Sequence, residues 1–111
     1  MKTSIMQLGN HTVITLKEPV HHQNCKELEA SVLDATGTSP RSIILECKEV
    51  GYVDSAALET LFRLQEAIKE RGSQVKLVGL NALCRDIMIA TRLISQFNIY
   101  SNVPEAIKEP S

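Results

Sequence analysis

Asp54 and Ser55 are the residues of this chain whose types and position best suit chemistry at a surface. They follow the apolar run Ser42–Cys47 and a short turn, and they precede a segment with helical spacing. Backbone N–H groups at a helix start are unpaired and carry partial positive charge, so a seryl oxygen there is well placed to accept a phosphate group. The alternative is that Asp54 or Ser55 only caps the helix, as these residue types commonly do.

A phosphate group on Ser55 would change the charge of this helix end. It adds about −1.5 to −2 charges near pH 7. The helix N-terminus would partly stabilise the added charge, whereas the carboxylates of Asp54 and Glu59 would oppose it. A partner bound over the helix end would therefore meet both new bulk and new charge.

The segment His21-His22-x-x-Cys25 places two imidazoles and a thiol near another helix start. A closed zinc site needs four ligands, and the sequence supplies no fourth one nearby, so we expect two exposed histidines and a core-facing cysteine. The chain has no glycine-rich phosphate loop and no HExxH, CxxC or GxSxG pattern. Ser55 has no identifiable base, and a thiol in an apolar strand such as Cys47 is usually inert. We therefore expect no enzyme activity, no metal and no cofactor.

The composition is typical of one folded domain, which we expect to span residues 1–111. Hydrophobic residues make up 43% of the chain and charged residues 23%, which is enough to form a core. A net charge of −1 argues against nucleic-acid binding, and the lysines, Lys76 among them, are spread as on solvated faces. No segment has the apolar length of a membrane span or a signal peptide, so we expect a cytoplasmic protein without membrane insertion. The odd number and wide spacing of the cysteines predict reduced core thiols at Cys25, Cys47 and Cys84.

The N-terminal third predicts a β-hairpin followed by a helix. Two runs rich in β-branched residues, Ser4–Leu8 and Thr12–Leu16, flank the turn Gly9-Asn10. A helix should begin near Asn24, whose side chain can cap it, and should end at Gly37–Pro40. Its apolar positions recur at three- and four-residue steps: Cys25, Leu28, Val32 and Ala35.

The rest of the chain predicts alternating strands and helices. Ser42–Cys47 reads as a strand covered on both faces. The helix after Asp54 carries an apolar arc formed by Leu58, Leu61, Leu64 and Ile68, opposite the charged residues Glu59, Arg63, Glu66 and Glu70, and Gly72 suits its C-terminal end. The further expected elements are a strand at Gln74–Val78, a helix from Asn81 that carries Leu83, Ile87 and Ala90, a strand at Phe97–Tyr100 and a helix near Pro104–Lys108. This alternation predicts an α/β fold with a mixed sheet of about four to five strands and about four helices.

The element order, with the turn Gly51-Tyr-Val-Asp-Ser-Ala-Ala-Leu58 and the strand after Arg71, resembles the STAS domain of bacterial anti-sigma factor antagonists over nearly the whole chain. The strongest part is Val53–Leu64, with a hydrophobic residue, Asp, Ser and a helix start rich in small residues. In family members that switch partners, an anti-sigma factor serine kinase phosphorylates the Ser after that Asp, which corresponds to Ser55 here. The resemblance implies that the unphosphorylated form binds the kinase and frees its sigma factor. Phosphorylation then releases it, and a cognate phosphatase resets the cycle.

The resemblance implies a partner-binding surface and leaves three functions open. The leading one is a non-enzymatic regulator of transcription, present as a monomer or weak dimer, that binds an anti-sigma factor kinase. The alternatives are a subunit of a lipid-transporting ABC complex that binds its ATPase and a stress-signalling scaffold subunit. The residues expected on the partner-binding surface are Asp54, Ser55, Ala56, Leu58, Glu59, Phe62, His21 and His22.

The chain departs from the usual family pattern at several of these places. The family often has Gly at the positions of Ala57 and Glu59 and an Asp at that of His21, and a Thr-Gly pair stands where this chain has Thr91-Arg92. Ala is a better helix former than Gly, so the first change should stiffen the helix start. Glu59 places a negative charge about one helical turn from Ser55.

Overall fold

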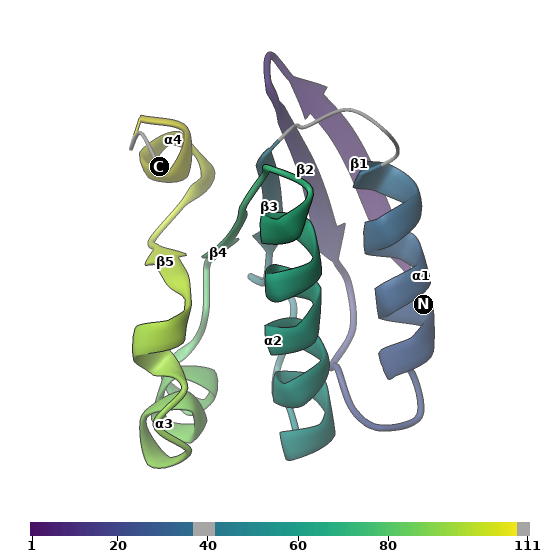
Figure 1. Ribbon diagram of the computed structural model, residues 1–111. Helices are drawn as coiled ribbons and strands as arrows, with labels where there is room; N and C mark the ends of the chain where they lie inside the picture. Colours follow the sequence, from purple (N-terminus) through teal and green to yellow (C-terminus); the bar gives the residue numbers. More distant parts are fainter. Residues whose placement is uncertain (37–41, 109–111) are drawn as a thin grey trace.

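The computed structural model describes residues 1–36 and 42–108, which contain a five-stranded mixed sheet (Figure 1). The strands lie in the order β1-β2-β3-β4-β5; β1 runs antiparallel to β2, and all other neighbours are parallel. The strands are β1 (Thr3–Leu8), β2 (His11–Leu16), β3 (Ser42–Glu46), β4 (Val75–Val78) and β5 (Asn98–Tyr100). The expected α/β fold with a mixed sheet is confirmed.

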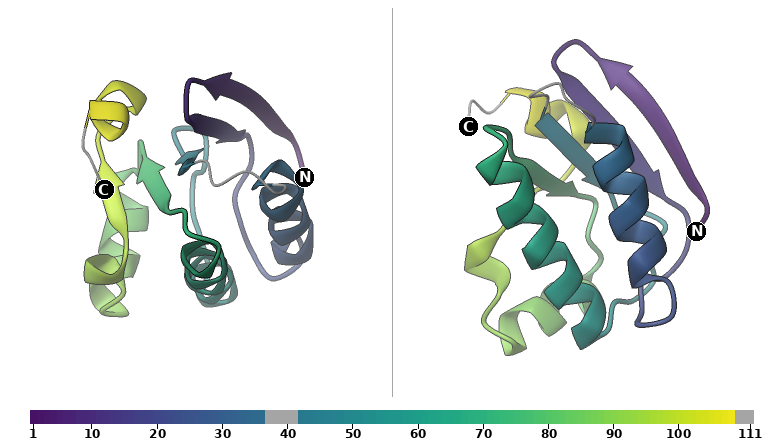
Figure 2. Two further views of the ribbon diagram at one scale, coloured as in Figure 1. Left: turned by 45° about the horizontal axis from the view of Figure 1, so that its top comes forward. Right: turned by 45° about the vertical axis from the view of Figure 1, so that its right-hand side comes forward.

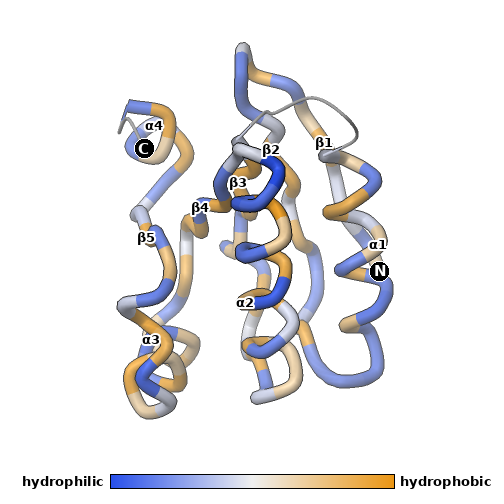
Figure 3. The backbone as a smooth tube through the Cα atoms, in the orientation of Figure 1, coloured by the Kyte–Doolittle hydropathy of each residue, from blue (hydrophilic) through white to orange (hydrophobic). Residues whose placement is uncertain are grey.

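Helices cover both faces of this sheet. They are α1 (Cys25–Thr36), α2 (Ser55–Glu70), α3 (Ala82–Ala90) and α4 (Val103–Lys108), with a short 3₁₀ helix η1 (Ile94–Gln96). Figure 2 shows α1, α2 and α3 on one side of the sheet and α4 on the other. Hydrophilic and hydrophobic residues alternate along α1 and α2 (Figure 3), as expected for helices with one buried face. The predicted apolar arc of α2 is buried: Leu58, Leu61, Leu64 and Ile68.

The central strand β3 is buried on both faces, as its continuous apolar run predicts. Ile43 and Leu45 belong to the main core beneath α1 and α2, whereas Ile44 packs with Val78 and Ala106 beneath α4. Successive side chains of a strand point to opposite faces, so one apolar run can serve two cores. This arrangement fixes β3, and the turn that follows it, in the middle of the molecule.

The predicted turn and cap residues lie where local geometry requires them. Gly9 has φ +60°, which suits the first central position of the two-residue hairpin turn between β1 and β2. Gly72 has φ +81° and ends α2, while the N–H of Ser73 donates to the carbonyl of Ile68 at 3.1 Å. The side chain of Asn81 accepts from the N–H of Cys84 at 2.8 Å and so caps α3. The predicted end of α1 at residues 37–40 lies outside the described residues.

The structure corrects the prediction about the helix cap at Asn24. Asn24 does not cap α1. Its Oδ1 accepts from the N–H of His21 at 2.9 Å and its Nδ2 donates to the carbonyl of Pro19 at 2.9 Å, so it stabilises the turn before the helix. Leu83 is 52% exposed, because α3 buries the side containing Cys84 and Met88.

Lys76 is a second correction, because it is only 1% exposed rather than solvated. It lies in β4 on the face covered by α4, and its Nζ donates to the carbonyl of Ala106 at 2.6 Å. The ammonium also lies 5.4 Å from the ring centre of Tyr100. A buried ammonium is tolerated only with such partners, so the sheet and α4 together determine its position.

Candidate functional site

The candidate site lies at the edge of the sheet where β2, β3 and β4 end. These strands are parallel, so the loops after them lead to the N-termini of α1, α2 and α3 at the same edge, which is the lower edge in Figure 1. The middle strand β3 leads to α2, whose first residue is Ser55. The fold therefore places Ser55 between the loop that leads to α1 and the loop that leads to α3.

Asp54 is the residue that caps α2. Its Oδ1 accepts from the N–H of Ala57 at 2.8 Å, and its extended backbone precedes the helix. Ser55 is the first helical residue, its side chain is exposed, and no hydrogen bond between described residues engages its hydroxyl. The sequence left open whether Asp54 or Ser55 caps the helix. In the structure Asp54 is the cap, and the Ser55 hydroxyl remains accessible.

The Asp54 carboxylate also joins two loops. Its Oδ2 accepts from the N–H of His22 at 2.9 Å and lies 3.6 Å from the His22 Nδ1. Burial raises the pKa of Asp54, but the hydrogen bonds from the N–H groups of Ala57 and His22, together with the His22 side chain, outweigh this and hold the pKa below its ordinary value. Asp54 is therefore ionised at neutral pH, and a full negative charge adjoins Ser55.

Backbone contacts hold the same two loops together. Val20 and Val53 form an isolated parallel bridge, and the N–H of Val20 donates to the carbonyl of Tyr52 at 3.2 Å. The rings of His21 and Tyr52 stack with centres 6.4 Å apart and planes 19° from parallel. Tyr52 is 44% exposed. The stacked pair thus forms part of the surface beside the α2 N-terminus.

The third loop is tied to this surface by Asn81. Its Nδ2 donates to the carbonyl of Gly51 at 3.0 Å while its Oδ1 caps α3. The exposed Leu83 follows two residues later. Tyr52, Asn81 and Leu83 therefore extend the candidate surface, and the sequence interpretation had not assigned them to it.

The model of one protein family, described as the STAS domain, matches residues 2–106. The chain belongs to the STAS domain family. The match includes every strand and all of α1, α2 and α3.

Solved structures similar to this STAS domain fall into more than one protein class. A Thermotoga maritima protein assigned as an anti-sigma factor antagonist is 19% identical, with a TM-score of 0.86 over 96% of this chain and 92% of that one. The anti-sigma factor antagonist SpoIIAA in its unphosphorylated form is 11% identical, with a TM-score of 0.65 over 96% and 94%. The murine anion transporter Slc26a9 is 17% identical, with a TM-score of 0.81 over 92% of this chain but 18% of the transporter. At these identities the likeness shows the shared fold.

The residues expected on the partner-binding surface of this STAS domain occupy different environments. Ser55 and Glu59 are exposed one turn apart on α2, and His22 is exposed beside Asp54. His21 and Ala56 are partly buried at the same end of the helix.

Leu58 and Phe62 lie outside that surface group. Leu58 is 1% exposed and packs in the core, because its side chain lies on the sheet-facing side of α2. This corrects its assignment to the partner-binding surface. Phe62 is partly buried and meets Phe97 edge-on, with ring centres 6.4 Å apart. Phe62 is seven residues from Ser55, about 10 Å along the helix.

The cysteines of the STAS domain are free and buried. Burial raises the pKa of the Cys47 thiol to about 12, with smaller contributions from Cys84 and Glu46. The Cys25 thiol donates to the backbone carbonyl of His21 at 3.0 Å. Within residues 1–36 and 42–108, no group of three His, Cys, Asp or Glu side chains is placed to hold a metal ion. None of the described helices is long and apolar enough to cross a membrane.

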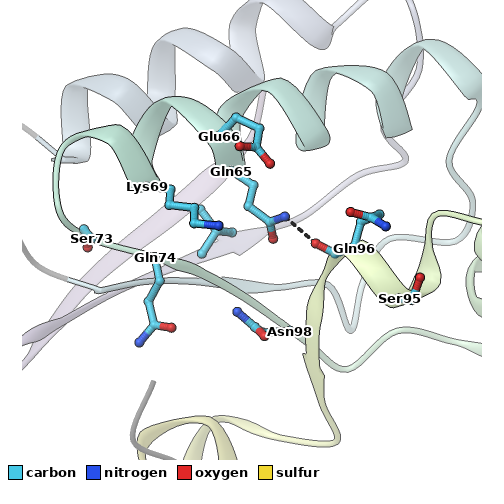
Figure 4. A pocket seen from close by; sticks show the side chains of 9 residues that line it. Gln65, Glu66, Lys69, Ser73, Gln74, Ser95, Gln96 and Asn98 are labelled. Atoms are coloured by element: carbon cyan, nitrogen blue, oxygen red, sulfur yellow. Dashed lines mark hydrogen bonds between the residues drawn. The ribbon is translucent and has the colours of Figure 1, made fainter.

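A polar hollow of about 410 Å³ lies far from Ser55, beside the C-terminal half of α2 (Figure 4). Gln65 points across it and donates to the carbonyl of Gln96, which joins α2 to η1. Lys69 and Asn98 also line it. Gln65 is ten residues from Ser55, about 15 Å along the helix, so the hollow and the candidate surface are separate.

Proposed function

We propose that this STAS domain is a non-enzymatic regulator that binds an anti-sigma factor serine kinase, and that phosphorylation of Ser55 controls the complex. The observation that supports the proposal is that Asp54 caps the N-terminus of α2 while Ser55 does not. Asp54 satisfies the N–H of Ala57 and anchors the adjoining loop, so the Ser55 hydroxyl is exposed and has no capping role. A kinase can therefore reach it without unwinding the helix.

The surface around Ser55 supplies contacts of different chemical kinds. Tyr52 and Leu83 offer partly exposed apolar area, while Glu59 and Asp54 supply negative charge. Partly exposed aromatic and aliphatic side chains with a charged surround are typical of protein-binding surfaces. A partner seated here would cover Ser55.

Phosphorylation would change this surface in a definite way. The γ-phosphoryl group of ATP moves to the Ser55 oxygen, ADP leaves, and the hydroxyl proton is lost. The phosphate group adds about −1.5 to −2 charges to a chain whose formal net charge is −1. That charge lies beside the ionised Asp54 and one turn from Glu59, so a partner matched to the unmodified surface loses both fit and charge complementarity.

The test is to incubate the purified protein with candidate anti-sigma factor kinases and ATP, map the phosphorylated residue and measure kinase binding. We expect modification at Ser55, retained binding by Ser55→Ala and release by Ser55→Asp. Ser95→Ala, at an exposed serine outside the surface, is the matched control and should behave as wild type. Phosphorylation elsewhere, or equal kinase binding by Ser55→Ala and Ser55→Asp, would refute the switch.

Affinity purification separates the remaining alternatives. Recovery of an ABC ATPase in place of a serine kinase would replace the proposal with a transport role. Large assemblies of many copies on sizing columns would replace it with a scaffold role. A phosphatase that removes phosphate from Ser55 and restores kinase binding would complete the proposed cycle.

A further inference from the structure

The two imidazoles beside the N-terminus of α2 are held very differently. The ring of His21 stacks on Tyr52, and its Nδ1 accepts from the N–H of Gln23 at 3.2 Å. The side chain of His22 is 72% exposed, and its Nδ1 lies 3.6 Å from the Asp54 carboxylate. Its Nε2 has no hydrogen-bond partner among the residues that the structure describes. His22 can therefore turn its ring towards a new partner, whereas His21 would lose its stacking and its hydrogen bond.

The imidazole of His22 lies within reach of a phosphate group on Ser55. The backbone N–H of His22 donates to Oδ2 of Asp54 at 2.9 Å, and the imidazole lies beside the same carboxylate. Ser55 is the next residue, with its Cα about 3.8 Å from that of Asp54. Its side chain is exposed, and phosphorylation lengthens it and adds three acceptor oxygens. An N–H of the exposed imidazole can therefore donate to the phosphate.

The charges around Ser55 favour this contact. A phosphate group there adds negative charge beside the carboxylates of Asp54 and Glu59, so a cation held against Asp54 reduces their repulsion. Protonated His22 is such a cation. The other charged residues in the segments that lead into α1, α2 and α3 come in adjacent pairs of opposite sign, whose fields largely cancel: Lys17-Glu18, Lys26-Glu27, Lys48-Glu49 and Arg85-Asp86.

We infer that protonated His22 pairs with the phosphate group on Ser55, so that the charge of the phosphorylated surface depends on pH. The inference rests on the proposed phosphorylation of Ser55. A protonated imidazole has two N–H donors and can face the Asp54 carboxylate and the phosphate together. Histidine side chains and the second ionisation of phosphoserine both titrate at about pH 6 to 6.5. The net charge of the imidazole and the phosphate therefore changes from about 0 in mild acid to about −2 in mild alkali.

The pairing gives phosphorylation a weaker effect in mildly acidic solution. Below about pH 6 the imidazole and the phosphate nearly neutralise each other, and phosphorylation adds mainly bulk to the surface. Above about pH 7 the imidazole is neutral, and the full phosphate charge faces the partner. Release of the partner by phosphorylation should therefore weaken as the pH falls, and His22→Gln should reduce this dependence.

Phosphorus NMR of the protein with phosphoserine at position 55 tests the pairing. Incorporating phosphoserine during translation supplies this protein without any kinase. A nearby cation stabilises the doubly charged phosphate, so the midpoint of the phosphorus titration should lie about 0.3–0.7 pH unit lower with native His22 than in His22→Gln, as for an exposed ion pair. His22→Lys retains a positive charge at this position and should keep the low midpoint.

Lys69→Gln is the matched control for the loss of charge. It removes an exposed positive charge from α2 about 21 Å from Ser55, where ordinary salt screens the interaction, and it should leave the midpoint unchanged. His22→Gln keeps the backbone N–H that anchors the loop on Asp54, so its urea unfolding should match wild type. Equal midpoints with His22 and with His22→Gln, or an equal shift in Lys69→Gln, would overturn the inference.

Kinase binding at two pH values separates this inference from the proposed function. The ratio of kinase affinities for the unmodified and the phosphorylated protein should be larger at pH 8 than at pH 6, and less pH-dependent in His22→Gln. A kinase that releases the phosphorylated protein equally at both values would contradict the pH dependence while the control by phosphorylation stands. If no kinase binds, the proposed function fails, whereas the phosphorus titration still decides whether His22 pairs with the phosphate.

Discussion

Replacing Asp54 by alanine should destabilise the protein while replacing Ser55 should not. The Asp54 carboxylate accepts two backbone hydrogen bonds, from Ala57 and from His22 in a loop 32 residues away. Loss of a helix cap costs about 0.5–2 kcal/mol, and loss of a further hydrogen-bond acceptor costs about 0.5–1.5 kcal/mol. The ion pair with His22 adds little because the histidine is 72% exposed. The expected loss for Asp54→Ala is therefore roughly 1–3 kcal/mol.

Urea unfolding of matched variants measures this loss. Ser55→Ala should change the free energy of unfolding by less than about 0.5 kcal/mol, because Ser55 is exposed and does not cap α2. Asp54→Asn should fall between alanine and wild type, since its amide oxygen can still cap Ala57 but its amide nitrogen cannot accept from the N–H of His22. Equal stability of Asp54→Ala and wild type, or a larger loss for Ser55→Ala, would refute the assigned cap.

The pH dependence follows from the lowered pKa of Asp54. A carboxyl group whose pKa is lower in the folded than in the unfolded state stabilises the fold fully above the unfolded value, about 3.9. This stabilisation disappears as the pH falls through the folded pKa. The difference between wild type and Asp54→Ala should therefore be constant near neutral pH and shrink below about pH 4. A difference that grows in acid would contradict the geometry.

Three further predictions concern single positions elsewhere in the fold. Cys47, whose pKa burial raises to about 12, should resist alkylation in the native protein at pH 8 and react once urea unfolds the chain, as mass spectrometry would show. Gly79→Ala should lower the free energy of unfolding in urea by about 1 kcal/mol or more, because Gly79 has φ +74° and a Cβ there would lie 3.2 Å from the backbone N of Lys48. Gly51→Ala is the control: a Cβ there meets open space, so the free energy of unfolding should change little. Arg92→Gly should stabilise the protein by about 1 kcal/mol, because Arg92 holds φ +62°; an unchanged or lower melting temperature would contradict this.

The departures from the family pattern acquire physical meaning in the structure. Arg92 follows α3 in the left-handed conformation that glycine favours, which explains why glycine is usual there. Ala57 is fully buried, and its N–H donates to the capping carboxylate of Asp54. A small residue is therefore required at this position, but glycine is not. His21 stacks on Tyr52 and shapes the candidate surface. The fold therefore accommodates all three departures, and of these only His21 lies on the candidate surface.

Local patterns in the chain were sufficient to predict most elements of the fold. Turn residues such as Gly9 and Gly72 predicted their positions because each needs a backbone conformation that few other residues adopt. Periodicity predicted the buried side of α2 but did not select the buried side of α3, where Leu83 is exposed. In a short helix the few apolar positions fit more than one face, and only packing against the sheet selects between them.

The sequence by itself determined that a serine stands at the start of an amphipathic helix after a buried strand. Only the tertiary structure decided that Asp54 caps that helix, because both Asp and Ser are good capping residues and the choice depends on where the loop turns. That loop is positioned by the Val20–Val53 bridge, and the surface beside it by the Asn81–Gly51 hydrogen bond. These contacts join residues about thirty positions apart, beyond the few residues over which local spacing carries information.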